Sequence, residues 1–306
     1  MARAEPVIAG AERLGLAAAA ATGFQVGAAL VATRFIGGEL GPITIALLRY
    51  GIGVLCLVPF AASLRRLDMP ARDLAAILAL GIAQFGVLVA LLNFGLIHIH
   101  ASRAALLFAT FPMLTMLLAW ALGREALTRA KTMGVTLTLA GVAITLGEGV
   151  LQWRGGAEWL GAAAVLGAAL SGAVCAVFYR PYLERYPTLP IGLLAMLGAV
   201  VFLALLSLGE SPVALTLALD WPGWLAVIFI GLSSGTGYLL WLFALKHASP
   251  TRVTVFLALS PPTAALGEAA LLGEVPGWGT LAGMVAVAAG IRIATRAQRL
   301  PVAVPP

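Results

Sequence analysis

Long apolar runs, interrupted by short stretches that contain charges, Pro or Gly, dominate the pattern along the chain. Each run has about 20 residues, enough for a helix rising about 1.5 Å per residue to cross a hydrocarbon core of roughly 30 Å. Barrel strands would instead alternate apolar and polar positions over about 10 residues. The pattern therefore predicts an all-α integral membrane protein with ten transmembrane helices, at 14–33, 43–62, 74–96, 104–122, 132–150, 158–178, 190–208, 223–245, 253–272 and 277–294.

The amino-acid composition also indicates a lipid environment. Hydrophobic residues make up 61% of the chain and charged residues 10%, whereas soluble domains carry roughly 25% charged residues. The mean hydropathy is +1.01. Cys56 and Cys175 lie within apolar runs, where a thiol behaves as a small hydrophobic group. We therefore expect the lipid bilayer as the main partner, and no disulfide, metal or cofactor.

The distribution of Lys and Arg predicts the orientation, because cytoplasmic loops retain an excess of these residues. With the N-terminus inside, fifteen Lys and Arg lie on the cytoplasmic side, and only Arg34, Arg103 and Arg154 lie on the other side. Both termini are therefore expected in the cytoplasm, with the protein in the cell (inner) membrane. Since topology accounts for the net charge of +6, no nucleic-acid partner is expected.

The chain contains an internal repeat with a shift of 149 residues. The shift superposes Gly86 on Gly235, Phe94 on Phe243, His98 on His247, Arg103 on Arg252, Pro112 on Pro261, Glu125 on Glu274, Gly134 on Gly283 and Gly141 on Gly290. The repeat unit holds five spans, and because five is odd the second copy must be inverted in the membrane. We expect two inverted five-helix repeats, at 1–150 and 151–306. By exchanging conformations, the two repeats would give the bundle two packings, each open to one side of the membrane. The alternative is that duplication only built a larger bundle.

Two segments carry a resemblance to a known family. The first holds Pro112, Gly134 and Gly141, and the second holds Pro261, Gly283 and Gly290; each also has a Gly-Glu pair or a near equivalent, Gly123-Arg124-Glu125 in the first copy. Over about residues 14–296, the chain resembles the EamA-type transporters of the drug/metabolite transporter superfamily. The resemblance implies a ten-helix exporter or permease, and YddG-type exporters of aromatic amino acids are among its members. These motifs do not identify the substrate.

Polar side chains near the middle of the predicted spans define a candidate substrate cavity, because a polar group in hydrocarbon is costly without a partner. Gln25, Gln84, Ser171, Ser233 and Ser234 have this depth, and Gln84 aligns with Ser233 in the repeat. The alternatives are hydroxyls bonded to their own helix and amides bonded between helices. Aromatic side chains on the same spans would offer stacking or cation–π surfaces, or would pack in the core or against lipid; they are Phe24, Phe85, Tyr179, Tyr238 and Trp241.

Prolines near the centres of two spans are candidate hinges, because proline removes an intrahelical hydrogen bond and bends the helix. They are Pro112, Pro261 and Pro262, and they free the carbonyls of Phe108, Leu257 and Ala258. The alternative is a static bend held by packing. Asn93, His98 and His100 cluster at the outer end of the third span and would line an outer vestibule or form a hydrogen-bonded turn.

Two ions lie well inside predicted spans, and an unpaired buried charge is strongly unfavourable. Arg49 and Glu268 both lie roughly two turns from the outer surface, so we expect them to form a buried ion pair. Glycines in spans five and ten permit close helix packing within the fold or in a dimer; they are Gly134, Gly141, Gly279, Gly283 and Gly290. The oligomeric state is thus expected to be a monomer or a homodimer through these spans.

These features favour a secondary transporter that exports a small-molecule substrate by alternating access. Amino acids, including aromatic ones, are the favoured class; drugs, organic cations or other metabolites are alternatives. No phosphate-binding P-loop sequence is present, which argues against ATP hydrolysis. A channel and an intramembrane enzyme are further alternatives, but the chain has only three His, and none lies at midspan. We therefore expect no enzymatic activity.

The topology can be tested with single cysteines introduced into the 65–73 and 209–222 loops of a cysteine-free variant. We expect impermeant thiol reagents to label the second loop in intact cells and the first only after permeabilisation, because the Lys and Arg distribution places them on opposite sides. Labelling of both loops from one side would contradict the ten-span topology.

Overall fold

The computed structural model describes residues 4–36, 40–59, 68–98, 107–146, 156–210, 219–260, 262–263, 266–267 and 278–296, and every regular element within them is a helix. The first half contains α1 (Ala4–Ile36), α2 (Pro42–Leu57), α3 (Ala71–Gly81), η2 (Ile82–Val87), α4 (Leu88–His98), α6 (Phe111–Ala121) and α7 (Arg129–Leu146). The second half contains α8 (Gly156–Phe178), α9 (Arg180–Arg185), α10 (Thr188–Ser207), η4 (Leu208–Glu210), α12 (Trp221–His247), α13 (Pro250–Thr254), η5 (Val255–Leu259) and α15 (Trp278–Arg296).

Five helical segments of the described chain are long and apolar enough to cross a membrane: Gly10–Thr33, Ala71–Leu92, Glu158–Arg185, Thr188–Glu210 and Trp221–His247. Shorter apolar helices cover Ile43–Leu57, Phe111–Ala121, Pro250–Leu259 and Leu281–Thr295. The prediction of an all-helical, multi-pass membrane protein is confirmed at this level.

Some predicted spans depart from regular α-helices. The span expected at 74–96 is a continuous helical stretch, α3–η2–α4, whose central η2 is a π-helix. The span expected at 253–272 starts with α13 and continues as the 3₁₀-helix η5. Periodicity could not predict either change, because both keep the same apolar composition. Short π segments within α-helices are rare and often mark functional sites.

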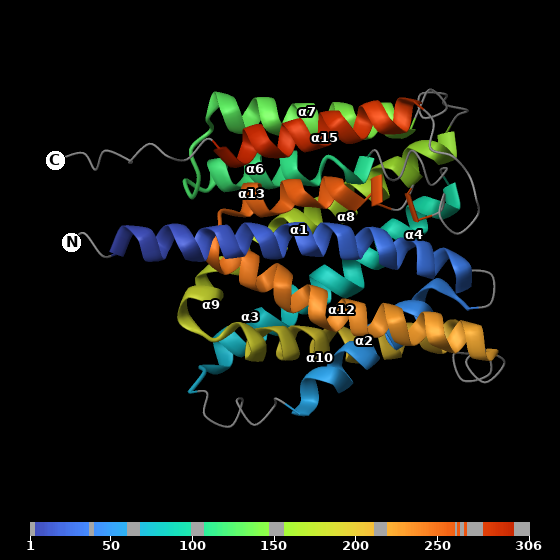
Figure 1. Cartoon of the computed structure of the whole chain (residues 1–306). Coiled ribbons are helices and arrows are strands. Elements are labelled where there is room, and N and C mark those ends of the chain that lie inside the picture. Colours follow the sequence, from blue (N-terminus) through green and yellow to red (C-terminus); the bar gives the residue numbers. More distant parts are fainter. Residues whose placement is uncertain are drawn as a thin grey trace.

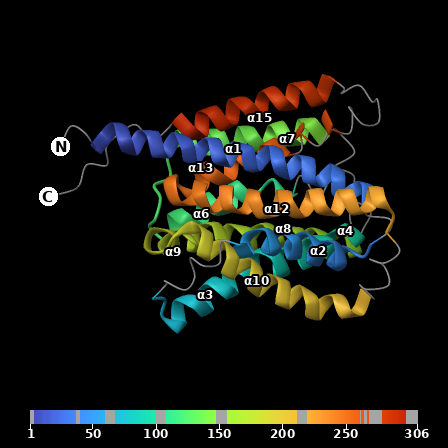
Figure 2. The ribbon, with the colours of Figure 1, turned by 60° about the horizontal axis from the view of Figure 1, so that its bottom comes forward.

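The helices run side by side in one bundle. In both views α7 and α15 form one edge and α3 and α10 the opposite edge, with α1 and α12 between them (Figure 1 and Figure 2). α1 begins and α15 ends at the same end of the bundle (Figure 1). α1 and α12 are antiparallel, since Gly15 lies against His247 while Gln25 bonds to Ser233.

The Gly123-Arg124-Glu125 segment connects the two halves at the end of the bundle where α1 begins (Figure 1). Gly123 ends α6 with a φ of +66°, a left-handed conformation that glycine adopts without strain. Glu125 accepts hydrogen bonds from Lys131 Nζ (2.7 Å) and from the backbone N–H of Thr251 in α13 (3.2 Å). The side chains of Lys131 and Glu125 are 1% and 3% exposed. Loss of either would leave a buried unpaired charge, which is strongly destabilising.

A second glutamate connects the halves at the opposite end. Glu210, in η4, accepts hydrogen bonds from the backbone N–H groups of Ile43 (3.1 Å) and Thr44 (2.8 Å), and from the Thr44 hydroxyl (2.9 Å). The carboxylate thus satisfies free donors in the first turn of α2 and interacts favourably with the helix dipole. Each half therefore supplies a glutamate to a helix start of the other half.

The outer surface of the bundle is apolar. Leu55, Leu205 and Val285 are between 66% and 70% exposed, a pattern suited to lipid and unfavourable in water. Trp159, Trp221 and Trp278 are also exposed near the starts of α8, α12 and α15. Indole rings favour the membrane interface, so these tryptophans would anchor the corresponding end of the bundle.

Glycines allow α7 and α15 to pack in backbone contact. A Cβ on Gly134 would lie 2.6 Å from the Ala294 Cβ, and one on Gly141 would lie 2.9 Å from the Gly283 carbonyl oxygen. The contact is antiparallel, because the later position on α7 meets the earlier one on α15. These glycines serve packing within the chain. A homodimer through the outer faces of the two helices stays a prediction.

Gly134→Ala should lower the midpoint of thermal unfolding in detergent, because the new methyl group overlaps α15 and overpacking typically costs about 1–3 kcal/mol. Gly51→Ala in α2 is the matched control: its added Cβ would meet no atom within 4 Å, and alanine favours a helix over glycine. We expect this control to be neutral or slightly stabilising. Equal losses in both variants would argue against tight α7–α15 packing.

Candidate functional site

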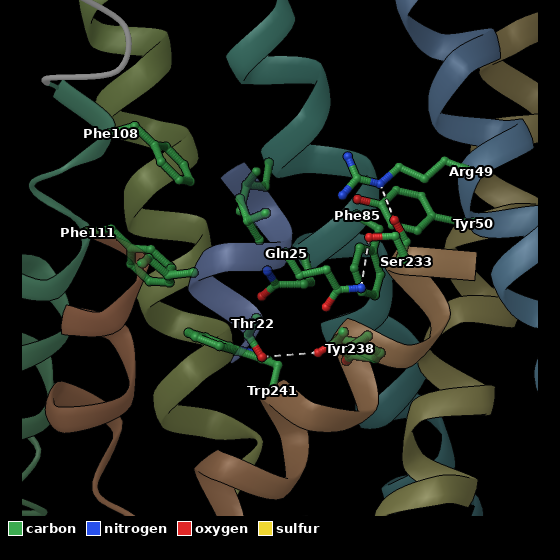
Figure 3. Close-up of a pocket in the computed structure, with 16 residues that line it drawn as sticks. Thr22, Gln25, Arg49, Tyr50, Phe85, Phe108, Phe111, Ser233, Tyr238 and Trp241 are labelled. Carbon is green, nitrogen blue, oxygen red and sulfur yellow. Dashed lines mark hydrogen bonds between the residues drawn. The ribbon is translucent and has the colours of Figure 1, made fainter. Parts of the chain in front are cut away.

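A cavity of about 170 Å³ lies inside the bundle and receives side chains from both halves (Figure 3). It is lined by Thr22, Gln25, Val26, Arg49, Tyr50, Gln84, Phe85, Leu88, Phe108, Phe111, Ser233, Ser234, Gly237, Tyr238, Trp241 and Leu257. Most of these side chains are apolar or aromatic, with a few polar groups among them. This combination is typical of sites for small organic molecules.

Gln25 joins α1 to α12 at the cavity. Its Nε2 donates to Ser233 Oγ (2.9 Å) and Thr236 Oγ1 (3.3 Å). Gly237 makes room for this amide, since a Cβ there would overlap the Gln25 side chain. With both donor contacts on Nε2, the buried Oε1 has no hydrogen-bond partner among the described residues. It is therefore a buried acceptor next to the cavity, packed against Gly237, whose hydrogen-bonding capacity no described residue uses.

Gln84 occupies the π-helix η2 together with Phe85. A π turn inserts one extra residue into the helix and so rotates the side chains that follow it, which is one way to aim an amide at a cavity. The buried Gln84 Oε1, like that of Gln25, has no partner among the described residues. A buried polar atom without a partner is costly, so a hydrogen bond from a solute or water to this amide oxygen would be favourable.

Aromatic rings form two walls that meet on α12. One wall joins Tyr50 to Phe85 (ring centroids 4.4 Å apart) and Phe85 to Tyr238 (4.6 Å, edge to face). On the other wall, Phe111 lies 6.2 Å from Trp241. Tilted and edge-to-face pairs are favourable geometries for aromatic rings. The walls provide flat apolar surface for a planar or branched hydrocarbon group.

Arg49 is the one formally charged residue among the described cavity-lining residues. Its Nε donates to Ser234 Oγ, and its guanidinium carbon lies 5.5 Å from the centroid of the Tyr50 ring. Sequence reasoning assigned it to an ion pair with Glu268. Because Glu268 lies outside the described residues, that pair stays a prediction.

The structure brings seven of the ten predicted cavity residues to this site: Gln25, Gln84, Ser233, Ser234, Phe85, Tyr238 and Trp241. The other three lie elsewhere. Phe24 is 54% exposed on the outer surface. Ser171 donates to the Ala83 carbonyl (2.9 Å), and Tyr179 is fully buried behind Tyr238, with ring centroids 6.2 Å apart. The depth of a residue along its span could not predict which side chains face the cavity, because depth does not determine how the helix is rotated about its axis.

The predicted hinge and vestibule residues have different surroundings from those expected. Pro112 lies in the first turn of α6, after a turn at 109–110, so the helix is interrupted there and not merely bent. Pro262 is buried, while Pro261 lies outside the described residues. His98 Nδ1 is 2.9 Å from the Phe94 carbonyl oxygen of its own helix. His100 and the side chain of Asn93 are outside the described set.

Several lining residues were missed as cavity residues, including Thr22, Tyr50 and Phe111. Thr22 Oγ1 bonds to the Ala18 carbonyl (2.9 Å), as many intramembrane hydroxyls do. Phe108 and Leu257 were predicted only through their backbone carbonyls, since each lies four residues before a proline. The Leu257 carbonyl, however, accepts from Ser260 Oγ (2.7 Å) and is not left free for a substrate.

Comparison with known proteins identifies the class of transporter. Residues 13–147 and 159–296 each match the EamA-like transporter family. The chain belongs to this family, as its motifs suggested.

Two relatives and one solved structure add detail. The chain is 30% identical over 238 residues, 74% of each chain, to a probable terminal-alkyne amino-acid exporter of Streptantibioticus cattleyicolor. It is 28% identical over 272 residues to an uncharacterized transporter of Archaeoglobus fulgidus, covering 88% of this chain and 94% of the relative. A solved structure titled "Crystal structure of protein" matches 90% of this chain and 98% of its own, with a TM-score of 0.75 and 21% identity. That likeness supports the fold alone.

Gln84→Ala should weaken the affinity for a transported solute by about 1–3 kcal/mol, if the unpaired Oε1 is a solute acceptor. Direct binding to purified protein measures this effect. Ser171→Ala is the control, because its hydroxyl bonds to a backbone carbonyl and does not line the cavity. Wild-type affinity in Gln84→Ala would remove Gln84 from the site, and joint loss of affinity and thermal stability would indicate a structural role.

Proposed function

We propose that this EamA-family protein is a secondary transporter of the cell (inner) membrane that exports amino acids, including aromatic ones. The observation that carries the proposal is the cavity inside a membrane-embedded bundle, lined by polar and aromatic side chains from both halves. An amino acid needs both kinds of surface. The name of the Streptantibioticus relative, an amino-acid exporter, supports the same substrate class.

We also propose ten spans arranged as two inverted repeats, 1–150 and 151–306, with cytoplasmic termini. Positions related by the 149-residue shift have matching surroundings. The ring centroids of Phe94 and His98 are 4.5 Å apart, and those of Phe243 and His247 are 4.2 Å apart. Each histidine Nδ1 also lies within 2.9 Å of the carbonyl of its partner phenylalanine. The antiparallel packing of the equivalent helices α7 and α15 supports opposite orientations of the two halves.

Alternating access is supported by polar contacts that join the halves at opposite ends of the bundle. Glu125 holds the start of α13 at one end, and Glu210 holds the start of α2 at the other. Release of one glutamate while the other stays bound would open the cavity to one side only. Because α2 carries Arg49 and Tyr50, movement at Glu210 would also reach the cavity.

Cavity size favours a small metabolite as the substrate. At about 170 Å³ the cavity is smaller than the roughly 300–1,000 Å³ of typical drug-sized sites. Its aromatic walls suit an apolar side chain, while the free oxygens of Gln25 and Gln84 suit an ammonium group. These features together favour amino acids over larger drugs.

Solute counterflow in proteoliposomes tests the proposal. Liposomes loaded with unlabelled L-phenylalanine should accumulate external labelled L-phenylalanine transiently and saturably, because a carrier exchanges bound solute across the membrane. Empty liposomes and liposomes loaded with a sugar are the controls. Non-saturable flux would indicate a channel, and counterflow of organic cations without amino acids would contradict the proposed substrate class.

A further inference from the structure

The Arg49 guanidinium is held in a defined orientation at the cavity. The Ser234 hydroxyl donates to the Ile230 carbonyl of its own helix (2.7 Å). Its oxygen is therefore oriented to accept from Arg49 Nε. The Tyr50 ring lies 5.5 Å from the guanidinium carbon, a distance suited to a cation–π contact. Two helices thus fix the arginine, which extends from α2 toward the side chains lining the cavity (Figure 3).

A fixed guanidinium is suited to binding a carboxylate. Arginine carries five N–H donors in a planar fork, and carboxylates accept two parallel hydrogen bonds from that fork. Among the described residues, Ser234 is the hydrogen-bond acceptor of Arg49 and takes up the Nε donor, so within that part of the chain the terminal nitrogens keep their donors for an anion. None of the described cavity-lining residues is acidic.

The remaining polar atoms complete a site for a zwitterion. The unpaired Oε1 atoms of Gln25 and Gln84 are acceptors only, so they suit an ammonium group and not a second anion. Rings from the two aromatic walls cover the space for a side chain. An organic cation without a carboxylate would find the acceptors and rings, but it would also be repelled by Arg49.

From this arrangement we infer that Arg49 binds the carboxylate of the transported solute and makes the cavity selective for carboxylate-bearing solutes over organic cations. The inference rests on the proposed transport function and extends it by naming a residue and a chemical group. It differs from the ion pair expected with Glu268, because the anionic partner is supplied by the substrate.

The test compares two ligands of nearly equal size, L-phenylalanine and L-phenylalaninamide, as competitors of labelled L-phenylalanine counterflow. The amide replaces the carboxylate with a neutral group and keeps the ring, and at about pH 6 both ligands carry an ammonium group. The wild-type protein should prefer phenylalanine at least tenfold, since hydrogen bonds to charged groups are among the stronger ones. Arg49→Gln should reduce this preference to near unity by weakening phenylalanine binding while leaving amide binding unchanged or tighter.

Two further variants separate a binding role from a structural one. Arg49→Lys keeps the charge but not the forked geometry, so it should show an intermediate preference; it also decides the case if Arg49→Gln does not fold. Arg180→Gln is the matched control, because Arg180 pairs with the exposed Glu184 on α9 and neither residue lines the cavity. It should retain the wild-type preference.

Several outcomes would overturn the inference. Equal weakening of both ligands in Arg49→Gln would indicate a structural role, and an unchanged preference in either Arg49 variant would remove Arg49 from carboxylate recognition. Restored phenylalanine preference in the double variant Arg49→Gln, Glu268→Gln would identify Glu268 as the partner. Equal wild-type transport of phenylalanine and its amide would overturn this inference alone, whereas transport of organic cations without amino acids would also overturn the proposed substrate class.

Discussion

A polar group inside a bilayer needs a partner within the protein, because hydrocarbon offers none. This constraint explains where polar side chains lie in the bundle. Isolated hydroxyls bond to their own helices, as Thr22 and Thr115 do. Charged groups such as Glu125 and Lys131 are buried in pairs at a helix end. Four of the eight buried side-chain atoms without a partner among the described residues belong to cavity-lining residues, and Gln25 and Gln84 each contribute an oxygen to them. The cavity is thus the place where a solute can replace a missing partner.

The polar site lies in a bundle whose helices pack closely in other places. α7 and α15 meet at backbone distance through glycines and form one edge of the bundle (Figure 2), and none of their residues lines the cavity. Around the cavity the helices are less regular, with a π-helix at Gln84, a turn before α6 and a 3₁₀-helix at Leu257. Irregular backbone at membrane depth is tolerated where it lines a cavity. Segments of 3₁₀- or π-helix within a helix often mark functional hinges or sites, so the same elements are candidates for conformational change.

The two glutamates at helix starts give the transport proposal a physical basis. A carboxylate bound to backbone N–H groups is a strong but local contact, so its release can be reversible. Glu125 lies in the repeated family motif, whereas Glu210 lies in a segment without repeat signal. The halves are therefore related in helix packing but joined by different contacts at the two ends. In the proposed alternating-access cycle, such a difference would allow the two open states to have different energies.

The amino-acid sequence by itself determined the membrane environment, the helical class and the family, because apolar run length, charge distribution and motif spacing are local or additive properties. It also selected Gln25, Gln84, Ser233 and Ser234, which line the cavity. Only the tertiary structure decided which faces meet: it excluded Ser171, Phe24 and Tyr179 from the cavity and added Tyr50 and Phe111. Helix rotation depends on packing against neighbours, and neither periodicity nor depth records it. For Arg49, the position within a span predicted a buried charge that needs a partner. That this side chain lines a cavity became evident only from the tertiary structure.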